Sequence, residues 1–171
     1  MRVNVETERL ILRNLVVEDA EAVFVWASDP VVNEFMIYPL HKNIEVTREW
    51  LKSKDINDPD DYDIGIVLKE TGELIGSGGF TYSAERDAWV VGYNIRKEYW
   101  GRGLVPEAMQ ALLELIRSER EVKAIEGEFA KANKKSGRVM EKLGMSYYSD
   151  YDYEKFDGSR RYEGNLYRRE F

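Results

Sequence analysis

One stretch of the chain, residues 93–108, constrains both the fold and the function. It reads YNIRKEYWGRGLVPEA, which is the end of a strand, two glycines one residue apart, and the first turn of a helix. Glycine lets a backbone approach a ligand with no side chain between them. The start of a helix presents unpaired N–H groups and the positive end of the helix dipole. The sequence therefore predicts a phosphate or pyrophosphate site at Gly101 and Gly103.

The elements on both sides of the glycines are predicted by their apolar spacing. A helix over residues 103–118 is indicated by residues that share one helical face, namely Val105, Ala108, Met109, Leu112, Leu113 and Ile116. Pro106 is tolerated there because it lies in the first helical turn. A strand over residues 88–95 is predicted by the alternation of Trp89, Val91, Tyr93 and Ile95 with Val90, Gly92 and Asn94.

Taken alone, the glycine pair also fits an ordinary turn before a helix. It is not a dinucleotide-binding fingerprint, because Pro106 stands where the third glycine is required. It is not the phosphate loop of the nucleoside triphosphatases either, because no Gly-Lys-Ser or Gly-Lys-Thr follows.

The composition narrows the possible chemistry. The chain has no cysteine, which excludes a disulfide framework, a thiol nucleophile and a zinc–thiolate site. A single histidine, His41, leaves no histidine cluster for a transition metal. The aspartate-rich residues 55–63 do not match a calcium loop, because Pro59 and Asp60 replace a ligand and the required glycine. We therefore expect no metal, and the length predicts one domain over residues 1–171.

The net charge of −7 argues against general binding of nucleic acid, which needs a basic surface. It suits a cationic substrate such as an amine, although solubility alone explains it equally well. Residues 1–6 lack the apolar core of a signal peptide, and no apolar run has membrane-spanning length. We expect a cytoplasmic protein with no membrane partner.

Periodicity and turn signals divide the rest of the chain into alternating elements. Helices are predicted over residues 18–27, from Asp29-Pro30 through Met36, over 45–54 and over 134–143. Strands are predicted over residues 8–14, 63–69, 73–81, 124–129, 145–153 and 161–170, the last two joined by a turn at Asp157-Gly158. This order predicts an α/β fold with a mixed sheet and helices on both faces.

Four separated motifs in this order resemble the GNAT acetyltransferases, and more closely their branch of ribosomal-protein N-terminal acetyltransferases. They are residues 7–13 (TERLILR), Gly92-Tyr93, residues 99–103 (YWGRG) with Glu107-Ala108, and residues 133–145 (NKKSGRVMEKLGM). The resemblance implies the GNAT fold with a mostly antiparallel sheet. It also implies direct transfer of an acetyl group from acetyl-CoA to a primary amine, on a protein N-terminus or a small molecule, in a ternary complex.

The resemblance further implies where acetyl-CoA binds. Backbone N–H groups of the glycine turn hold the pyrophosphate, and the pantetheine arm lies where the strand before the turn parts from the next strand. The expected coenzyme-binding residues are Tyr93, Asn94, Ile95, Arg96, Gly101, Arg102, Gly103, Leu104, Val105, Asn133 and Lys135. A basic cluster of Arg96, Lys97, Arg102, Lys131, Lys134 and Lys135 is a candidate for the 3′-phosphate. Val105 departs from the family, which usually has glycine or alanine there.

Three catalytic residues are predicted, Ser136, Asn133 and Glu126. Many GNAT enzymes protonate the thiolate with a tyrosine on the last helix; the aligned residue here is Met140, so the resemblance implies Ser136 instead. Its spacing places Ser136 on the inward helical face, although a small helix residue that bonds its own backbone is the alternative. Asn133 is expected to cap this helix and to bind the pantetheine arm or a water.

The sequence specifies the general base and the acceptor pocket less closely than the coenzyme site. Glu126 and Glu128 share one strand face and are candidate bases, with solvated charges as the alternative. Val90 replaces an acid that related enzymes carry. Glu128 and the aromatic residues Trp50, Phe80, Tyr82, Tyr151 and Tyr153 are candidates for the acceptor pocket, although such aromatics are more often core residues.

Two further expectations concern the whole protein. Met140, Val90 and Val105 motivate an alternative function, a non-catalytic coenzyme-A-binding sensor or scaffold. The tyrosine-rich C-terminal strands suggest a homodimer.

Overall fold

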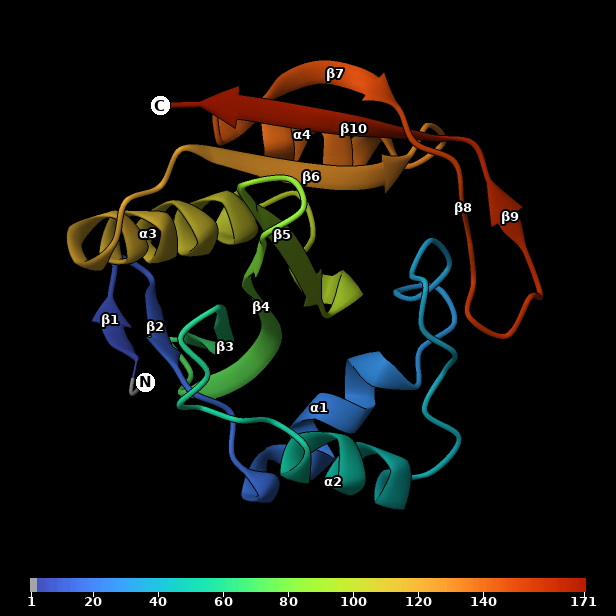
Figure 1. Cartoon of the computed structure of the whole chain (residues 1–171). Coiled ribbons are helices and arrows are strands. Elements are labelled where there is room, and N and C mark those ends of the chain that lie inside the picture. The colour runs from blue at the N-terminus through green and yellow to red at the C-terminus, as the bar shows by residue number, and fades with distance from the viewer. Residues whose placement is uncertain (1–2) are drawn as a thin grey trace.

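The computed structural model describes residues 3–171 (Figure 1). Met1 and Arg2, part of the segment predicted to lack a signal sequence, lie outside the described residues. The strands are β1 (Asn4–Glu6), β2 (Leu10–Arg13), β3 (Asp61–Leu68), β4 (Glu73–Ser83), β5 (Ala88–Ile95), β6 (Ala124–Ala130), β7 (Ser146–Asp150), β8 (Tyr153–Glu154), β9 (Arg161–Tyr162) and β10 (Gly164–Glu170). The helices are α1 (Ala20–Ala27), α2 (Ile44–Lys52), α3 (Leu104–Glu119) and α4 (Lys134–Lys142), with 3₁₀ turns η1 (Val17–Asp19) and η2 (Lys97–Tyr99). No helix in this range is long and apolar enough to cross a membrane.

Eight strands form one sheet in the order β1-β2-β3-β4-β5-β6-β10-β7. All neighbouring pairs are antiparallel except β5 and β6, which run parallel. A parallel pair needs a crossover, which α3 provides. The predicted mixed, mostly antiparallel sheet is confirmed.

The parallel pair β5–β6 is short. It joins Trp89 to Ile125, Val90 to Glu126 and Val91 to Gly127. Within the described chain the pairing ends there, although β5 continues to Ile95 and β6 to Ala130. The two strands therefore part beside the turn that leads into α3.

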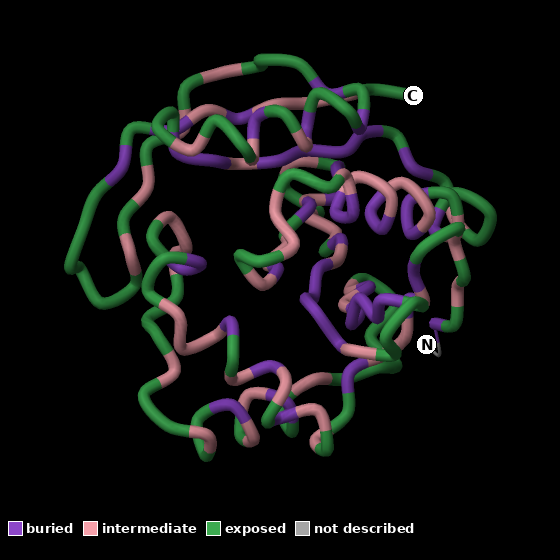
Figure 2. The backbone as a smooth tube through the Cα atoms, turned by 180° about the vertical axis from the view of Figure 1, so that it is seen from behind, coloured by how far each residue is buried: buried purple, intermediate pink, exposed green. Residues whose placement is uncertain are grey.

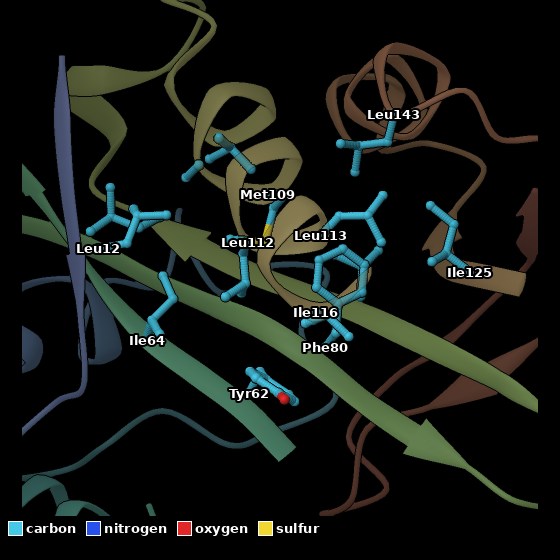
Figure 3. Close-up of a cluster of buried hydrophobic side chains, with 14 of the residues drawn as sticks. Leu12, Tyr62, Ile64, Phe80, Met109, Leu112, Leu113, Ile116, Ile125 and Leu143 are labelled. Atoms are coloured by element: carbon cyan, nitrogen blue, oxygen red, sulfur yellow. The ribbon is translucent and has the colours of Figure 1, made fainter. Parts of the chain in front are cut away.

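Helices cover both faces of the sheet, as predicted (Figure 1). On one face α3 and α4 enclose the main core, in which Phe80, Leu112 and Ile116 are fully buried (Figure 3). On the other face α1 and α2 bury a smaller cluster around Trp26 and Leu51. Buried residues run along the central strands, whereas the outer loops are mostly exposed (Figure 2).

The segment after Asp29 corrects one prediction, because it forms turns and not a helix. The Val31 N–H donates to the Asp29 side chain at 2.9 Å. The Asn33 side chain donates to the carbonyls of Trp26 and Asp29 at 2.6 and 2.8 Å. Side-chain bonds of this kind compete with helical ones and favour a turn.

Both ends of the chain also differ in detail from the prediction. The predicted first strand over residues 8–14 is the shorter β2, preceded by the separate strand β1. The predicted C-terminal pair is divided: β7 pairs with β10, while β8 and β9 form a separate hairpin. The predicted turn at Asp157-Gly158 is confirmed, with Gly158 at a φ of 70°.

The β8–β9 hairpin reaches across to the segment after α1. Tyr153 donates to the Phe35 carbonyl at 2.7 Å, and Lys155 donates to the Asn33 and Met36 carbonyls at 3.0 and 2.8 Å. Tyr162 donates to the Glu34 carbonyl. Main-chain carbonyl oxygens accept all these hydrogen bonds, so the hairpin holds the backbone of residues 33–36 in place.

Gly79 and Gly92 are paired across β4 and β5 but differ in the space around them. A Cβ on Gly79 would lie 2.0 Å from the Tyr62 carbonyl oxygen, whereas one on Gly92 would meet nothing within 4 Å. We expect Gly79→Ala to lower the free energy of unfolding by about 3 kcal/mol through overpacking. Gly92→Ala should change it by less than about 0.5 kcal/mol. Chemical denaturation measures both, and equal stabilities would contradict the close approach of β3 to Gly79.

Candidate active site

The glycine turn has the backbone shape that the sequence predicted. Gly101 and Gly103 have φ angles of 76° and 72°, in the left-handed region that favours glycine. Gly103 is the N-cap of α3, and the first helical hydrogen bond is donated by Glu107 to the Gly103 carbonyl at 3.3 Å. The N–H groups of Leu104 and Val105 precede that bond and are available to an anion.

The two side chains at the start of α3 leave the turn open. Leu104 and Val105 are both buried in the main core. The branched side chain of Val105 therefore points away from the exposed face of the turn, and its departure from the family pattern does not crowd the N–H groups.

A residue that the sequence reasoning missed, Arg9, holds this turn from outside. Its guanidinium donates to the Arg102 carbonyl at 2.8 Å and forms an ion pair with Glu107 at 2.6 Å. Its only sequence signal was membership of the TERLILR motif, which did not identify a partner.

Tyr93 and Ser136 meet across the gap between β5 and α4. The Tyr93 hydroxyl lies 2.8 Å from Ser136 Oγ and 3.2 Å from the Ser136 carbonyl, to which it donates. Burial raises the pKa of Tyr93 well above its ordinary value, and the bond to Ser136 only partly offsets this. Tyr93 is therefore neutral at physiological pH. Ser136 faces inward, as its helical spacing predicted.

Asn133 begins α4. Its side-chain oxygen accepts the Ser136 N–H at 3.4 Å, so the predicted capping role is confirmed. This cap fixes the turn of α4 that carries Ser136. Met140 lies on the inward face of the same helix, fully buried against Gly127, where a Cβ would come within 2.3 Å of its sulfur.

The end of β5 presents its residues to opposite sides. Ile95 is buried in the main core, whereas the Asn94 side chain donates to Asn33 Oδ1 at 3.1 Å. Asn94 therefore faces the α1 side of the sheet. Asn33 is a second residue that the sequence reasoning did not single out for the site.

Most of the predicted basic cluster is engaged with protein partners. Arg96 pairs with Glu73 and Glu98, Lys97 with Asp29, and Lys131 with Asp150. The Lys135 ammonium lies 4.0 Å from the centroid of the Trp100 ring, and Arg102 stacks on Tyr99. Among the ion pairs of residues 3–171, none involves Arg102, Lys134 or Lys135.

Glu126 and Glu128 belong to a network with two arginines. Glu126, with a side chain 4% exposed, accepts from Arg168 at 2.6 Å and from Arg86 at 3.3 Å. Glu128, 27% exposed, also pairs with Arg86. Arg86 in turn lies 3.3 Å from the Tyr151 hydroxyl. Glu126 thus has a buried, fully partnered carboxylate, whereas part of Glu128 remains open to solvent.

The predicted acceptor aromatics are not brought together. Phe80 is fully buried in the core beneath α3 (Figure 3). Tyr82, near the end of β4, packs against Trp89 with tilted rings and donates to Asp87. Trp50, on α2, packs edge-on against His41. The Phe80 side chain points to the core side of β4. The prediction that Phe80 lines the acceptor pocket is therefore wrong. Tyr151 and Tyr153 are near Glu128, and burial raises the pKa of Tyr153 to about 12.

A further carboxylate on the sheet, Asp63, was also missed by the sequence reasoning. Asp63 pairs with Gly79 in the sheet register, and Gly79 pairs with Gly92, so one row of residues leads from Asp63 to the parting strand. Burial raises the pKa of Asp63 in spite of its ion pair with Lys54.

Known proteins share the sequence pattern and the fold of this chain. A sequence profile of the acetyltransferase (GNAT) domain matches residues 9–146. The uncharacterized N-acetyltransferase p20 of Bacillus licheniformis is 30% identical over 158 residues, which cover 89% of this chain and 88% of that protein.

Two solved structures show the same fold. The microcin C7 self-immunity acetyltransferase MccE, in complex with acetyl-CoA and AMP, has a TM-score of 0.84 at 18% identity and covers 96% of this chain and 94% of its own. The ribosomal-protein-S5-alanine acetyltransferase from Vibrio fischeri has a TM-score of 0.72 at 19% identity, over 98% of this chain and 96% of its own.

The ion pairs of Glu126 lead to a stability prediction. Glu126→Gln leaves Arg86 and Arg168 facing a neutral amide in a buried place, so we expect the free energy of unfolding to fall by about 3 kcal/mol. Glu128→Gln, at a partly exposed pair, should cost less than about 1 kcal/mol. Chemical denaturation distinguishes the two, and a Glu126→Gln variant as stable as the parent would contradict the structural role of the ion pairs.

Proposed function

Because the chain belongs to the GNAT family of acetyltransferases, we propose that it transfers an acetyl group from acetyl-CoA to a primary amine by direct attack within a ternary complex. The amine is carried by a protein N-terminus or by a small molecule. The observation that carries the proposal is the early end of the β5–β6 pairing beside the glycine turn. It leaves backbone groups of β5 unpaired where a pantetheine arm binds in this family.

The coenzyme fits the residues present. The N–H groups of Gly103, Leu104 and Val105 receive the pyrophosphate at the positive end of the α3 dipole. The main chain of Tyr93, Asn94 and Ile95 lines the gap, with Asn133 across from it. Arg102, Lys134 and Lys135, which have no carboxylate partner among the described ion pairs, are the proposed contacts of the 3′-phosphate; Arg96 shapes the turn through its own ion pairs.

Ser136 is the proposed proton donor to the departing thiolate. When bound, acetyl-CoA supplies a reactive thioester, and the chain must place a proton where the sulfur leaves. The Ser136 hydroxyl is held by Tyr93 at 2.8 Å and its helical turn is fixed by the Asn133 cap. As Ser136 gives up its own proton, the neutral Tyr93 hydroxyl turns from the Ser136 carbonyl, to which it donates at 3.2 Å, and donates its hydrogen bond to Ser136 Oγ instead.

The attacking amine must be neutral, so its proton needs an acceptor. We propose that Glu128 takes it through water, because its carboxylate is partly exposed and lies beside the parting strand. Glu126 has a supporting role in this proposal, because its ion pairs hold Arg86 and Arg168 in place. The acceptor lies over Gly92, where the sheet carries no side chain, and is flanked by Asn94, Tyr151 and Tyr153.

A turnover assay with an amine panel tests the role of Ser136. We expect Ser136→Ala to lower kcat about 100-fold, the usual contribution of a positioned acid, while the calorimetric Kd for acetyl-CoA stays within a factor of about two. Ser136→Thr, which keeps the hydroxyl, is the matched control. Full turnover by Ser136→Ala would remove the acid role but not the family.

Binding by the parent protein is measured first. Saturable binding of acetyl-CoA at one site per chain, weakened when the 3′-phosphate is removed, supports the coenzyme site. Failure to bind at millimolar ligand would refute it. Binding without transfer to any amine would favour the sensor or scaffold function.

We further propose that the chain forms a homodimer through β7. This strand ends the eight-stranded sheet, and its Tyr147 and Tyr148 side chains are 57% and 62% exposed. An unpaired edge is a template for another strand. We expect light scattering to give twice the mass of one chain, and Tyr148→Lys to reduce it to that of one chain. A single-chain mass for the parent at every concentration would reject the dimer.

A further inference from the structure

We propose that Arg9 and Glu107 form a clamp that positions the glycine turn for the coenzyme, so that affinity for acetyl-CoA depends on the N-terminal segment of the chain. The inference rests on the proposed function, because it concerns the same pyrophosphate site. Arg9 and Glu107 are positioning residues, since they act through the backbone of the turn.

Residues 7–9 supply the hydrogen-bond donors that satisfy the Glu107 carboxylate. Its Oε1 accepts from the Thr7 hydroxyl at 2.6 Å and from the Arg9 N–H at 2.9 Å. Its Oε2 accepts from Arg9 Nε at 2.7 Å and lies 2.6 Å from Arg9 Nη2. This two-nitrogen contact on one carboxylate is charge-assisted and restricts the guanidinium to one orientation.

The remaining guanidinium nitrogen reaches the turn itself. Arg9 Nη1 donates to the Arg102 carbonyl at 2.8 Å, between the two glycines. A Cβ on Gly103 would lie 3.7 Å from Arg9 Nη2, so the guanidinium lies alongside the turn. In a trans peptide the carbonyl and the next N–H point in opposite directions. Holding the Arg102 carbonyl toward Arg9 therefore directs the Gly103 N–H away from Arg9.

This restraint matters because the Arg102–Gly103 peptide leads into a glycine, whose φ can change sign at little cost. Gly101 and Gly103 adopt left-handed φ angles, and glycine populates both signs of φ readily. Without the bond from Arg9, the Arg102–Gly103 peptide is free to rotate and to turn its carbonyl oxygen toward the anion. The clamp fixes the orientation in which an N–H, and not a carbonyl, faces the phosphate.

The clamp also removes an unfavourable charge. Glu107 lies in the first turn of α3, at the end of the helix that should attract an anion. Burial opposes its ionisation, but the hydrogen bonds from Thr7 and Arg9 hold the pKa of Glu107 below its usual value. The carboxylate is therefore ionised at neutral pH, and Arg9 neutralises its repulsion of a phosphate.

The segment that supplies the clamp is anchored on its other side. The Lys69 N–H donates to the Arg9 carbonyl at 2.9 Å, and the Lys69 ammonium donates to the Thr7 carbonyl at 2.6 Å. Arg9 is thus fixed between Lys69, which follows β3, and the start of α3. All three guanidinium nitrogens contact protein acceptors, which favours a positioning role over direct contact with phosphate.

The test measures the Kd for acetyl-CoA by calorimetry on the full chain. We expect Arg9→Ala and Glu107→Gln each to raise Kd about tenfold, or about 1.4 kcal/mol. The double variant should be no weaker than either single one, because both remove one interaction. The kcat at saturating acetyl-CoA should stay within a factor of about two. Arg9→Lys should not restore affinity, because an ammonium does not bridge two acceptors in this way.

Controls separate the clamp from general loss of stability. Arg13 and Asp19 form a comparable pair at the other end of β2, with Arg13 donating through two nitrogens at 2.8 Å. Arg13→Ala and Asp19→Asn should leave Kd unchanged, and all variants are compared below their melting temperatures.

Three outcomes overturn the clamp. An unchanged Kd in Arg9→Ala and Glu107→Gln shows that the turn does not need it. A higher Kd in Arg9→Ala alone shows that Arg9 contacts the phosphate directly. A double variant weakened by the product of the two single effects shows that the residues act independently. If the parent protein itself does not bind acetyl-CoA, the proposed function fails first, and this result is distinct from the other three.

Discussion

The interrupted hydrogen-bond ladder between β5 and β6 is the feature on which the rest of the site depends. Three residue pairs join these strands before they separate. Buried backbone groups must find partners, so a strand that loses its neighbour leaves donors and acceptors that another extended chain can satisfy. The crossover helix α3 begins at this same place because a parallel pair requires one. The gap proposed for the pantetheine arm and the proposed anion site thus both arise where β5 and β6 part.

The parting strand also serves two faces of the sheet at once. Tyr93 points to α4 and bonds Ser136, whereas the next residue, Asn94, points to the α1 side and bonds Asn33. Adjacent residues of a strand necessarily face opposite ways. In the proposed mechanism the proton donor, Ser136, and the acceptor amine therefore lie on different sides of this strand. This separation explains why the two glutamates on β6 take no part in the Tyr93–Ser136 contact.

Local signals in the sequence predicted most of the elements and the parts of the site that depend on them. Helical spacing predicted α3, the glycines predicted its N-terminal turn, and Asn133 was recognised as a cap. Features that depend on strand order were not predictable in this way. Glu126 meets Arg168 because β6 pairs with β10, and Arg9 meets Glu107 across 98 residues of chain. Phe80 was assigned to a pocket because alternation along one strand does not say which face is the core.

The β8–β9 hairpin has a consequence for how residues 33–36 can change over evolution. Its tyrosines and Lys155 bond the main-chain oxygens of residues 33–36, and every amino acid supplies such an oxygen. Mutations in this segment can therefore change its side chains while the hydrogen bonds from the hairpin to its main chain persist. Three side chains of the segment also have partners of their own. Asn33 bonds Trp26 and Asn94, Glu34 pairs with Arg160, and Phe35 packs against Tyr162. The main-chain bonds of this segment thus tolerate substitution, whereas the side-chain contacts of residues 33–35 restrict it.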